Sequence, residues 1–365
     1  MRRGKILLIA RTATANAAGA ALGVVESIYL RSLGLHPGLV GAYLGASTLI
    51  SAVADAHGRK RTVLASSALP LAGLLALYLG MAPGILLVYL GPSGAYAALY
   101  AENAEDPDRD WSHLSIAAVA SNAAGSLIPS ALTMRGTLVA ALAIYAAGIA
   151  ALAAVRERYG GSGRVTFGMA SKGTLARLSS AAIIGLGAGM IIPMLPLWLN
   201  AAYGVGPGPI GVLMAVQSAA MALAFWGAPR ISSRLGRLRT IVLTQGIGVA
   251  LLAIFPLSAT FEAAAILWTL RSIAMNMANP LFYAMVNDLV PEEERARANS
   301  ALQLMDSVPR SLGPYATGTM MEMGDMALPF YVTAALYGAA TASLYLLMRD
   351  RARRVMEAVE RAPLR

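Results

Sequence analysis

The 365-residue chain contains no cysteine, and only 13% of its residues are charged. The absence of cysteine excludes disulfide bonds, cysteine metal sites and thiol catalysis. Soluble domains carry about 25% charged residues, so half that share together with 57% hydrophobic residues indicates a membrane protein. The three histidines, His36, His57 and His113, do not have zinc-binding spacing. There is also no phosphate-binding glycine-rich loop, so we expect no metal, no cofactor and no ATP-driven activity within this chain.

The positive charges fall between apolar runs rather than in one basic domain. The chain has a net charge of +10, which in a soluble protein would first suggest a nucleic-acid partner. Here the cations flank segments apolar enough to enter a bilayer, so contact with anionic lipid explains the positive charge better than a nucleic-acid partner does. We therefore expect the lipid bilayer, and no nucleic acid, as a partner.

The apolar runs predict an all-α polytopic membrane protein, because about 20 mostly apolar residues suffice for a helix to cross a bilayer. Twelve such runs occur, six on each side of a polar segment, and we expect two six-helix bundles. The predicted spans are 6–30, 38–54, 62–80, 84–101, 111–133, 137–155, 177–200, 209–229, 240–258, 261–283, 299–321 and 328–348. This gives an N-terminal bundle over 1–155, a cytoplasmic linker over 156–176, a C-terminal bundle over 177–348 and a basic cytoplasmic tail over 349–365. As a helix that tail would lie on the inner leaflet, and otherwise it would be solvated.

Lysine and arginine predict the orientation. The two ends of the chain and the even-numbered loops carry 24 of the 29 basic residues, whereas the opposite side carries only Arg31 and Arg135. Short cytoplasmic loops are enriched in these residues. We therefore expect a plasma-membrane protein with both termini in the cytoplasm.

Two basic turns occupy corresponding places in the two halves. The first is Asp55-Ala56-His57-Gly58-Arg59-Lys60-Arg61, and the second is Ser233-Arg234-Leu235-Gly236-Arg237-Leu238-Arg239. The first resembles the loop signature that follows the second helix in the major facilitator superfamily of transporters, and the second resembles its weaker copy after the eighth helix. The chain departs from the family pattern at three positions. Ser51, Ala56 and Ser233 stand where the family has a glycine, a basic residue and an acid, respectively.

This resemblance implies a secondary transporter in which two bundles rock about a central site and expose it alternately to each side. It implies a gating role for the turn residues, which are Asp55, Gly58, Arg59, Lys60, Arg61, Gly236 and Arg237. It does not name the solute, which could be a small organic anion or an amphipathic, drug-like molecule, and proton coupling stays open. We expect a monomer. The alternatives are a polytopic membrane enzyme and a non-transporting sensor on the same fold.

Ionisable residues inside the predicted spans are the candidates for solute binding or ion coupling, because such residues are costly in a membrane. Arg271 lies mid-depth in the tenth span, which by the resemblance lines the central cavity. It has no acid within one helical turn, so it would meet an anionic solute, or Glu26 or Asp306 from another helix. Glu26 could carry a proton, or it could be a solvated residue at the outer mouth.

The remaining candidates have equally plausible structural roles. Asp306 and Arg310 are four residues apart on one helical face, so they form either a self-neutralising pair or a pair that breaks during transport. Arg11 could bind, or its long side chain could reach the inner interface. Polar neighbours that could line a cavity, or bond between helices instead, are Asn16, Asn122, Gln217, Asn276, Asn279 and Gln303.

Overall fold

Helices make up the whole of the secondary structure that the computed structural model describes. The described residues are 2–54, 60–88, 107–155, 172–277, 279, 281–282 and 295–360. Within them the first half of the chain forms α1 (Arg2–Ser32), α2 (Pro37–Ala54), α3 (Lys60–Tyr78), α4 (Gly84–Val88), α6 (Pro107–Ser126), α7 (Ile128–Ala131) and α8 (Met134–Ala153). We call this set the N-half. The all-α fold that the sequence predicts is confirmed.

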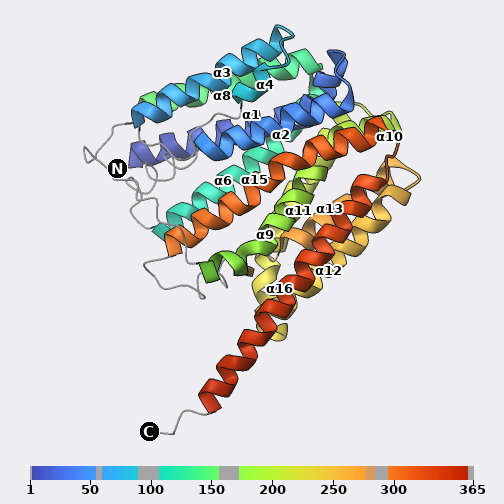
Figure 1. Cartoon of the computed structure of the whole chain (residues 1–365). Coiled ribbons are helices and arrows are strands. Elements are labelled where there is room, and N and C mark those ends of the chain that lie inside the picture. Colours follow the sequence, from blue (N-terminus) through green and yellow to red (C-terminus); the bar gives the residue numbers. More distant parts are fainter. Residues whose placement is uncertain are drawn as a thin grey trace.

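The second half, here called the C-half, repeats this arrangement. It contains α9 (Lys172–Ile191), α10 (Leu195–Tyr203), α11 (Pro207–Leu235), α12 (Arg237–Ile254), the short 3₁₀ helix η1 (Phe255–Leu257), α13 (Phe261–Asn276), α15 (Arg295–Glu322) and α16 (Leu328–Glu360). Figure 1 shows the long helices side by side, with α1 beginning and α16 ending at the same end of the bundle. We call this the terminal end and the opposite one the far end.

The predicted spans overlap these helices. Each of the twelve spans contains a described helix, although only Gly84–Val88 of the fourth belongs to the described residues. Four of the described helices are long and apolar enough to cross a membrane by themselves, and a fifth span results when the end of α9 is joined to α10. Many large apolar side chains face outward, among them Leu223, Leu257 and Ile266. Such exposure suits lipid rather than water.

Prolines break several spans that the sequence analysis treats as continuous. α9 ends at Ile191, and α10 starts at Leu195 with its axis turned by 40°. Pro193 and Pro196 lie at this break, where they donate no backbone hydrogen bond and therefore interrupt the helical ladder. Pro129 has the same effect in the fifth span, which divides into α6 and α7 around Leu127.

Other boundaries lie beyond those predicted. α11 continues past 229 to Leu235, so the second basic turn reduces to one residue, Gly236, before α12. Its φ of +81° favours glycine. α16 runs without a break to Glu360, so residues 349–360 continue the twelfth span as one helix. α9 starts at Lys172, five residues before the predicted span. The rest of the predicted linker lies outside the described residues.

Glycines allow helices of the two halves to pack with their backbones in direct contact. A Cβ atom at Gly41 or Gly45 of α2 would overlap the backbone oxygen of Pro314 or Ser311 on α15. A Cβ atom at Gly211 of α11 would likewise overlap the backbone oxygen of Ser126 on α6. These pairs join helices of opposite halves, and close approach through small residues is the usual way in which membrane helices associate. These glycine contacts lie in the first halves of α2 and α11, and therefore hold the two halves of the chain together on the side of the far end.

Candidate functional site

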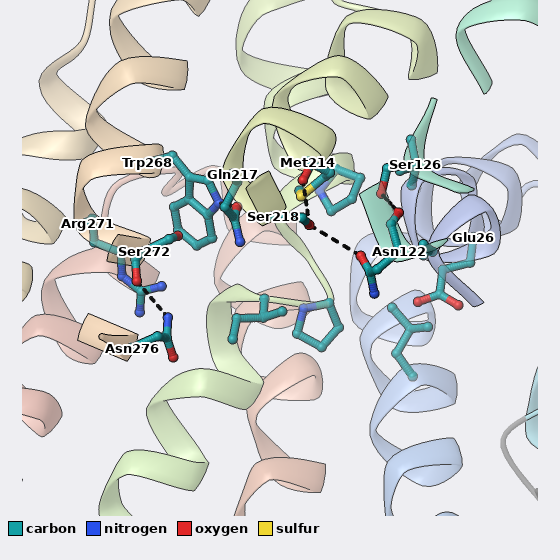
Figure 2. A pocket seen from close by; sticks show the side chains of 17 residues that line it. Glu26, Asn122, Ser126, Met214, Gln217, Ser218, Trp268, Arg271, Ser272 and Asn276 are labelled. Atoms are coloured by element: carbon teal, nitrogen blue, oxygen red, sulfur yellow. Dashed lines mark hydrogen bonds between the residues drawn. The ribbon is translucent and has the colours of Figure 1, made fainter. Parts of the chain in front are cut away.

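A cavity of about 330 Å³ lies between the two halves. The N-half contributes residues of α1, α2 and α6, and the C-half contributes α10, α11, α13 and the break before α10. Its polar lining consists of Glu26, Asn122, Ser126, Gln217, Ser218, Arg271, Ser272 and Asn276 (Figure 2). The apolar remainder includes Leu44, Ile192, Pro193, Pro196, Met214 and Trp268. A pocket that both halves build is suited to open toward either side when the halves move.

Arg271 of α13 is the cation of this cavity. Only 2% of its surface is exposed. Its Nη2 donates a hydrogen bond to Tyr337 Oη of α16 at 3.2 Å, and its guanidinium carbon lies 4.8 Å from the centre of the Trp268 ring. Its Nε has no hydrogen-bond partner among the residues that the structure describes. Neutral groups therefore hold Arg271 in place, through cation–π contact and one hydrogen bond.

Glu26 of α1 lies on the other wall and is 5% exposed. Figure 2 shows Glu26 and Asn122 on one side of the cavity, and Arg271, Ser272 and Asn276 on the opposite side. Asp306, which the sequence suggests as an alternative partner of Arg271, bonds to Arg310 instead. Two oppositely charged groups thus line one cavity from different halves of the chain.

Neutral hydrogen-bonding groups lie between these two charges. Trp268 Nε1 donates to Gln217 Oε1 at 2.6 Å, which fixes the indole ring beside Arg271. Ser218 Oγ bonds to Met214 O at 2.9 Å and lies 3.4 Å from Asn122 Oδ1, which connects α11 to α6. The amide of Asn276 donates to Ser272 O on its own helix. The polar groups of the lining are therefore held by hydrogen bonds within the protein.

Arg11 and Asn16 of α1 do not line the cavity. Arg11 Nη2 donates to Tyr145 Oη of α8 at 2.8 Å, and the guanidinium carbon lies 4.5 Å from the centre of that ring. Arg11 is 5% exposed, so its side chain is buried against α8 rather than extended to the interface. Its Nε and Nη1 have no hydrogen-bond partner in the described part of the chain. Asn16 donates back to Thr12 O on its own helix.

Asp306 and Arg310 of α15 form a two-pronged ion pair. Arg310 Nη2 lies 2.8 Å from Asp306 Oδ2, and Arg310 Nε donates to the same oxygen at 3.0 Å. Both side chains are between a quarter and a third exposed, and neither lines the cavity. Their backbone packs against Gly185 and Gly189 of α9. The pair is formed, as the sequence spacing suggests, but it lies apart from the candidate site.

The gating turns are only partly visible. Asp55, Gly58 and Arg59 lie outside the described residues. Lys60 and Arg61 form the start of α3, and their side chains are likewise not described. Gly236 separates α11 from α12, and Arg237 begins α12. The gating role of all these residues stays a prediction.

The aromatic partners of the buried cations were not predicted from the sequence. Tyr337 contacts Arg271, and Tyr145 contacts Arg11. A signal for both was present, because Ile144-Tyr145-Ala146-Ala147 in the sixth span matches Leu336-Tyr337-Gly338-Ala339 in the twelfth. Trp268 was also detectable, since it lies three residues before Arg271 and so on the same helical face.

The structure is similar to solved membrane transporters over nearly its whole length. The nucleoside transporter NupG matches with a TM-score of 0.76 and 13% identity, covering 94% of this chain and 98% of NupG. A bacterial homologue of the iron transporter ferroportin, in an inward-facing state, matches with a TM-score of 0.74 and 16% identity, covering 94% and 98%. A bacterial homologue of the human lysosomal transporter Spinster, inward-facing and occupied, gives 0.72 and 14%, covering 94% and 96%.

The sequence comparisons assign the family. No curated protein matches the chain. The model of the Major Facilitator Superfamily matches residues 178–364, slightly more than half of the chain. The predicted resemblance, the helical fold with its two related halves and the solved neighbours agree with this match. The chain is a multi-pass membrane protein that belongs to the Major Facilitator Superfamily.

Proposed function

We propose that the protein is a secondary active transporter that moves a small organic solute by alternating access to the central cavity. The observation that carries this proposal is the position of the cavity, which residues of both halves line, with the buried Arg271 and Glu26 in the part of the lining that the structure describes. Rocking the halves about such a site would expose it to one side of the membrane at a time. The family and the solved neighbours are transporters, which favours transport over the membrane-enzyme and sensor alternatives.

By their descriptions the neighbours include a nucleoside transporter, a homologue of an iron transporter and a peptide transporter, so they support the mechanism rather than a solute. We place the protein in the plasma membrane with the terminal end in the cytoplasm, as a monomer that contacts lipid and no nucleic acid. In this orientation the glycine contacts close the outer side.

The proposed energy source is a proton gradient, with exchange of a proton for the solute. Glu26 is the proton-binding group in this scheme, because it is an acid of a membrane helix that faces the cavity. Protonation would remove its charge and with it one of the two fixed charges that a solute meets. The direction of transport follows from the exchange, since inward proton flow would drive the solute outward.

The test is a solute screen in proteoliposomes with an imposed pH gradient. The expected result is accumulation or release of one solute class that depends on the protein and on the gradient. Glu26→Gln should abolish the effect of the gradient, while Glu262→Gln, the same change at an exposed site at the start of α13, should preserve it. If no solute crosses, and single-cysteine labelling finds the cavity accessible from one side only, the proposal is wrong.

A further inference from the structure

We infer that the solute carries a carboxylate, or another oxygen group with a single negative charge, that binds Arg271 of α13. This inference rests on the proposed function and specifies the chemical class of its solute. Arg271, Ser272 and Asn276 lie together on one wall of the cavity (Figure 2). Glu26 lines the opposite wall and has an interaction of its own within the protein, so Arg271 is the residue that sets the charge of a group bound at α13.

The positive charge of Arg271 is only partly compensated by its surroundings. No carboxylate of the described residues forms an ion pair with it. Its Nη2 donates a 3.2 Å hydrogen bond to Tyr337 Oη, and its guanidinium carbon lies 4.8 Å and 5.4 Å from the ring centres of Trp268 and Tyr337. These partners are neutral, whereas a buried cation needs an anion or water to offset its desolvation. An anionic group in the cavity should therefore bind here more tightly than a neutral group of the same size.

Two buried polar atoms on this wall lack a hydrogen-bond partner in the described part of the chain. They are Nε of Arg271 and Oγ of the adjacent Ser272, and both residues line the cavity. Buried polar groups in folded proteins nearly always have partners, so unpaired donors in a cavity wall point to a partner outside the chain. A carboxylate has two oxygens and can accept from a guanidinium and a hydroxyl at once. α13 thus presents the donors that such a group needs.

The described lining favours one negative charge on this group rather than two. Arg271 is the single cation among the lining residues that the structure describes. A phosphate monoester carries about 1.5 to 2 negative charges near neutral pH, whereas a carboxylate carries one. One guanidinium balances the carboxylate fully, but it would leave part of the charge of the phosphate without a counter-ion.

The rest of the lining suits an apolar body of modest size. The cavity of about 330 Å³ lies near the lower end of the range for small-molecule sites, roughly 300 to 1,000 Å³. Leu44, Ile192, Met214 and Trp268 contribute apolar surface to it. A small organic acid with an apolar body therefore matches the cavity in charge, size and polarity.

The test measures binding to the purified full-length chain in lipid nanodiscs, with probes that share a body and differ in one group. The pairs are hexanoate and hexanamide, octanoate and octanamide, and phenylacetate and phenylacetamide, and hexyl phosphate is added as the more highly charged ester. Dissociation constants follow from the rise in unfolding temperature with probe concentration. We expect at least one acid to bind about 10- to 100-fold more tightly than its amide, the usual value of one hydrogen bond to a charged group. Hexyl phosphate should bind no more tightly than hexanoate.

Variants of α13 assign this preference to its residues. Arg271→Ala should remove the preference for the acid over the amide while amide binding persists, and Arg271→Lys should retain part of it. Arg271→Met keeps an apolar side chain of similar length and gives the same readout if the alanine variant does not fold. Ser272→Ala should lower the preference by about 2- to 10-fold, as expected for a neutral hydrogen bond. Arg135→Ala, which removes an exposed arginine of α8, should leave it unaltered.

Three results would overturn the inference. They are equal binding of each acid and its amide, no binding by any acid, and a preference for the acid that survives in both Arg271→Ala and Arg271→Met. Tighter binding of hexyl phosphate than of hexanoate would overturn the assignment of a single charge. A transported solute without an anionic group would also overturn the inference and leave the proposed transport function intact. If the acids bind as expected and no solute crosses in the proteoliposome screen, the proposed function fails and the anion site stands.

Discussion

Replacing Gly41 by alanine should open the far end of the protein. The new Cβ atom would overlap the carbonyl oxygen of Pro314 and come within 3.0 Å of Tyr315 Cα, both backbone atoms of α15. A helical backbone cannot yield locally, so the overlap is relieved when α2 and α15 separate. Overpacking of this kind costs about 1–3 kcal/mol. If only the closed state bears that cost, the ratio of open to closed molecules rises by about 5- to 150-fold.

Spin labels measure this shift directly. The chain has no native cysteine, so cysteines placed at Ser32 and Met323, which are exposed residues of opposite halves near the far end, carry the only labels. Gly41→Ala should move the distance distribution toward longer values in lipid nanodiscs. Gly246→Ala provides the matched control, because a Cβ atom there meets nothing within 4 Å. An unchanged distribution together with a lower unfolding temperature would show that the glycine only stabilises the fold.

Three further changes test other contacts. Asp306→Asn should lower the free energy of unfolding by about 1–3 kcal/mol, because it leaves the partly buried Arg310 without its anion. Thermal unfolding measures this loss. The double variant Asp306→Asn/Arg310→Gln should recover part of it, which checks the pairing. Glu322→Gln breaks the exposed 2.8 Å contact with His36, which joins α15 to the start of α2. Because exposed ion pairs contribute little, a double-mutant cycle on these two residues should give an interaction energy of less than about 1 kcal/mol. Single cysteines at Ser233 and at His36 should react with impermeant reagents from opposite sides of the membrane, and same-side labelling would contradict the twelve-span topology.

The positions of the spans were predictable because the bilayer imposes a length and a composition on each crossing helix. The ends and breaks were less so. Pro193 and Pro196 could have indicated the break after α9, yet Pro229 lies inside α11 without ending it. Membrane helices tolerate proline where neighbouring groups satisfy the freed backbone groups.

The candidate site was predictable in its charges but not in its assembly. Arg271, Glu26 and Asn276 were identified because polar residues at membrane depth need a reason to be there, and all three line the cavity. Arg11 and Asn16 satisfy the same rule, yet they contact α8 and their own helix instead. Which face of a helix meets the cavity depends on packing between residues far apart in sequence. A single sequence gives little information about such packing.

The bend between α9 and α10 divides the seventh membrane segment into two helices whose axes differ by 40°. α9 packs against α15 and α16 of its own half, whereas α10 also contacts α1 of the other half. Ile192 and Pro193, at the joint itself, belong to the wall of the cavity. Under the proposed transport function, a solute in the cavity would contact this bend, so solute binding and the angle between α9 and α10 would be coupled within a single segment.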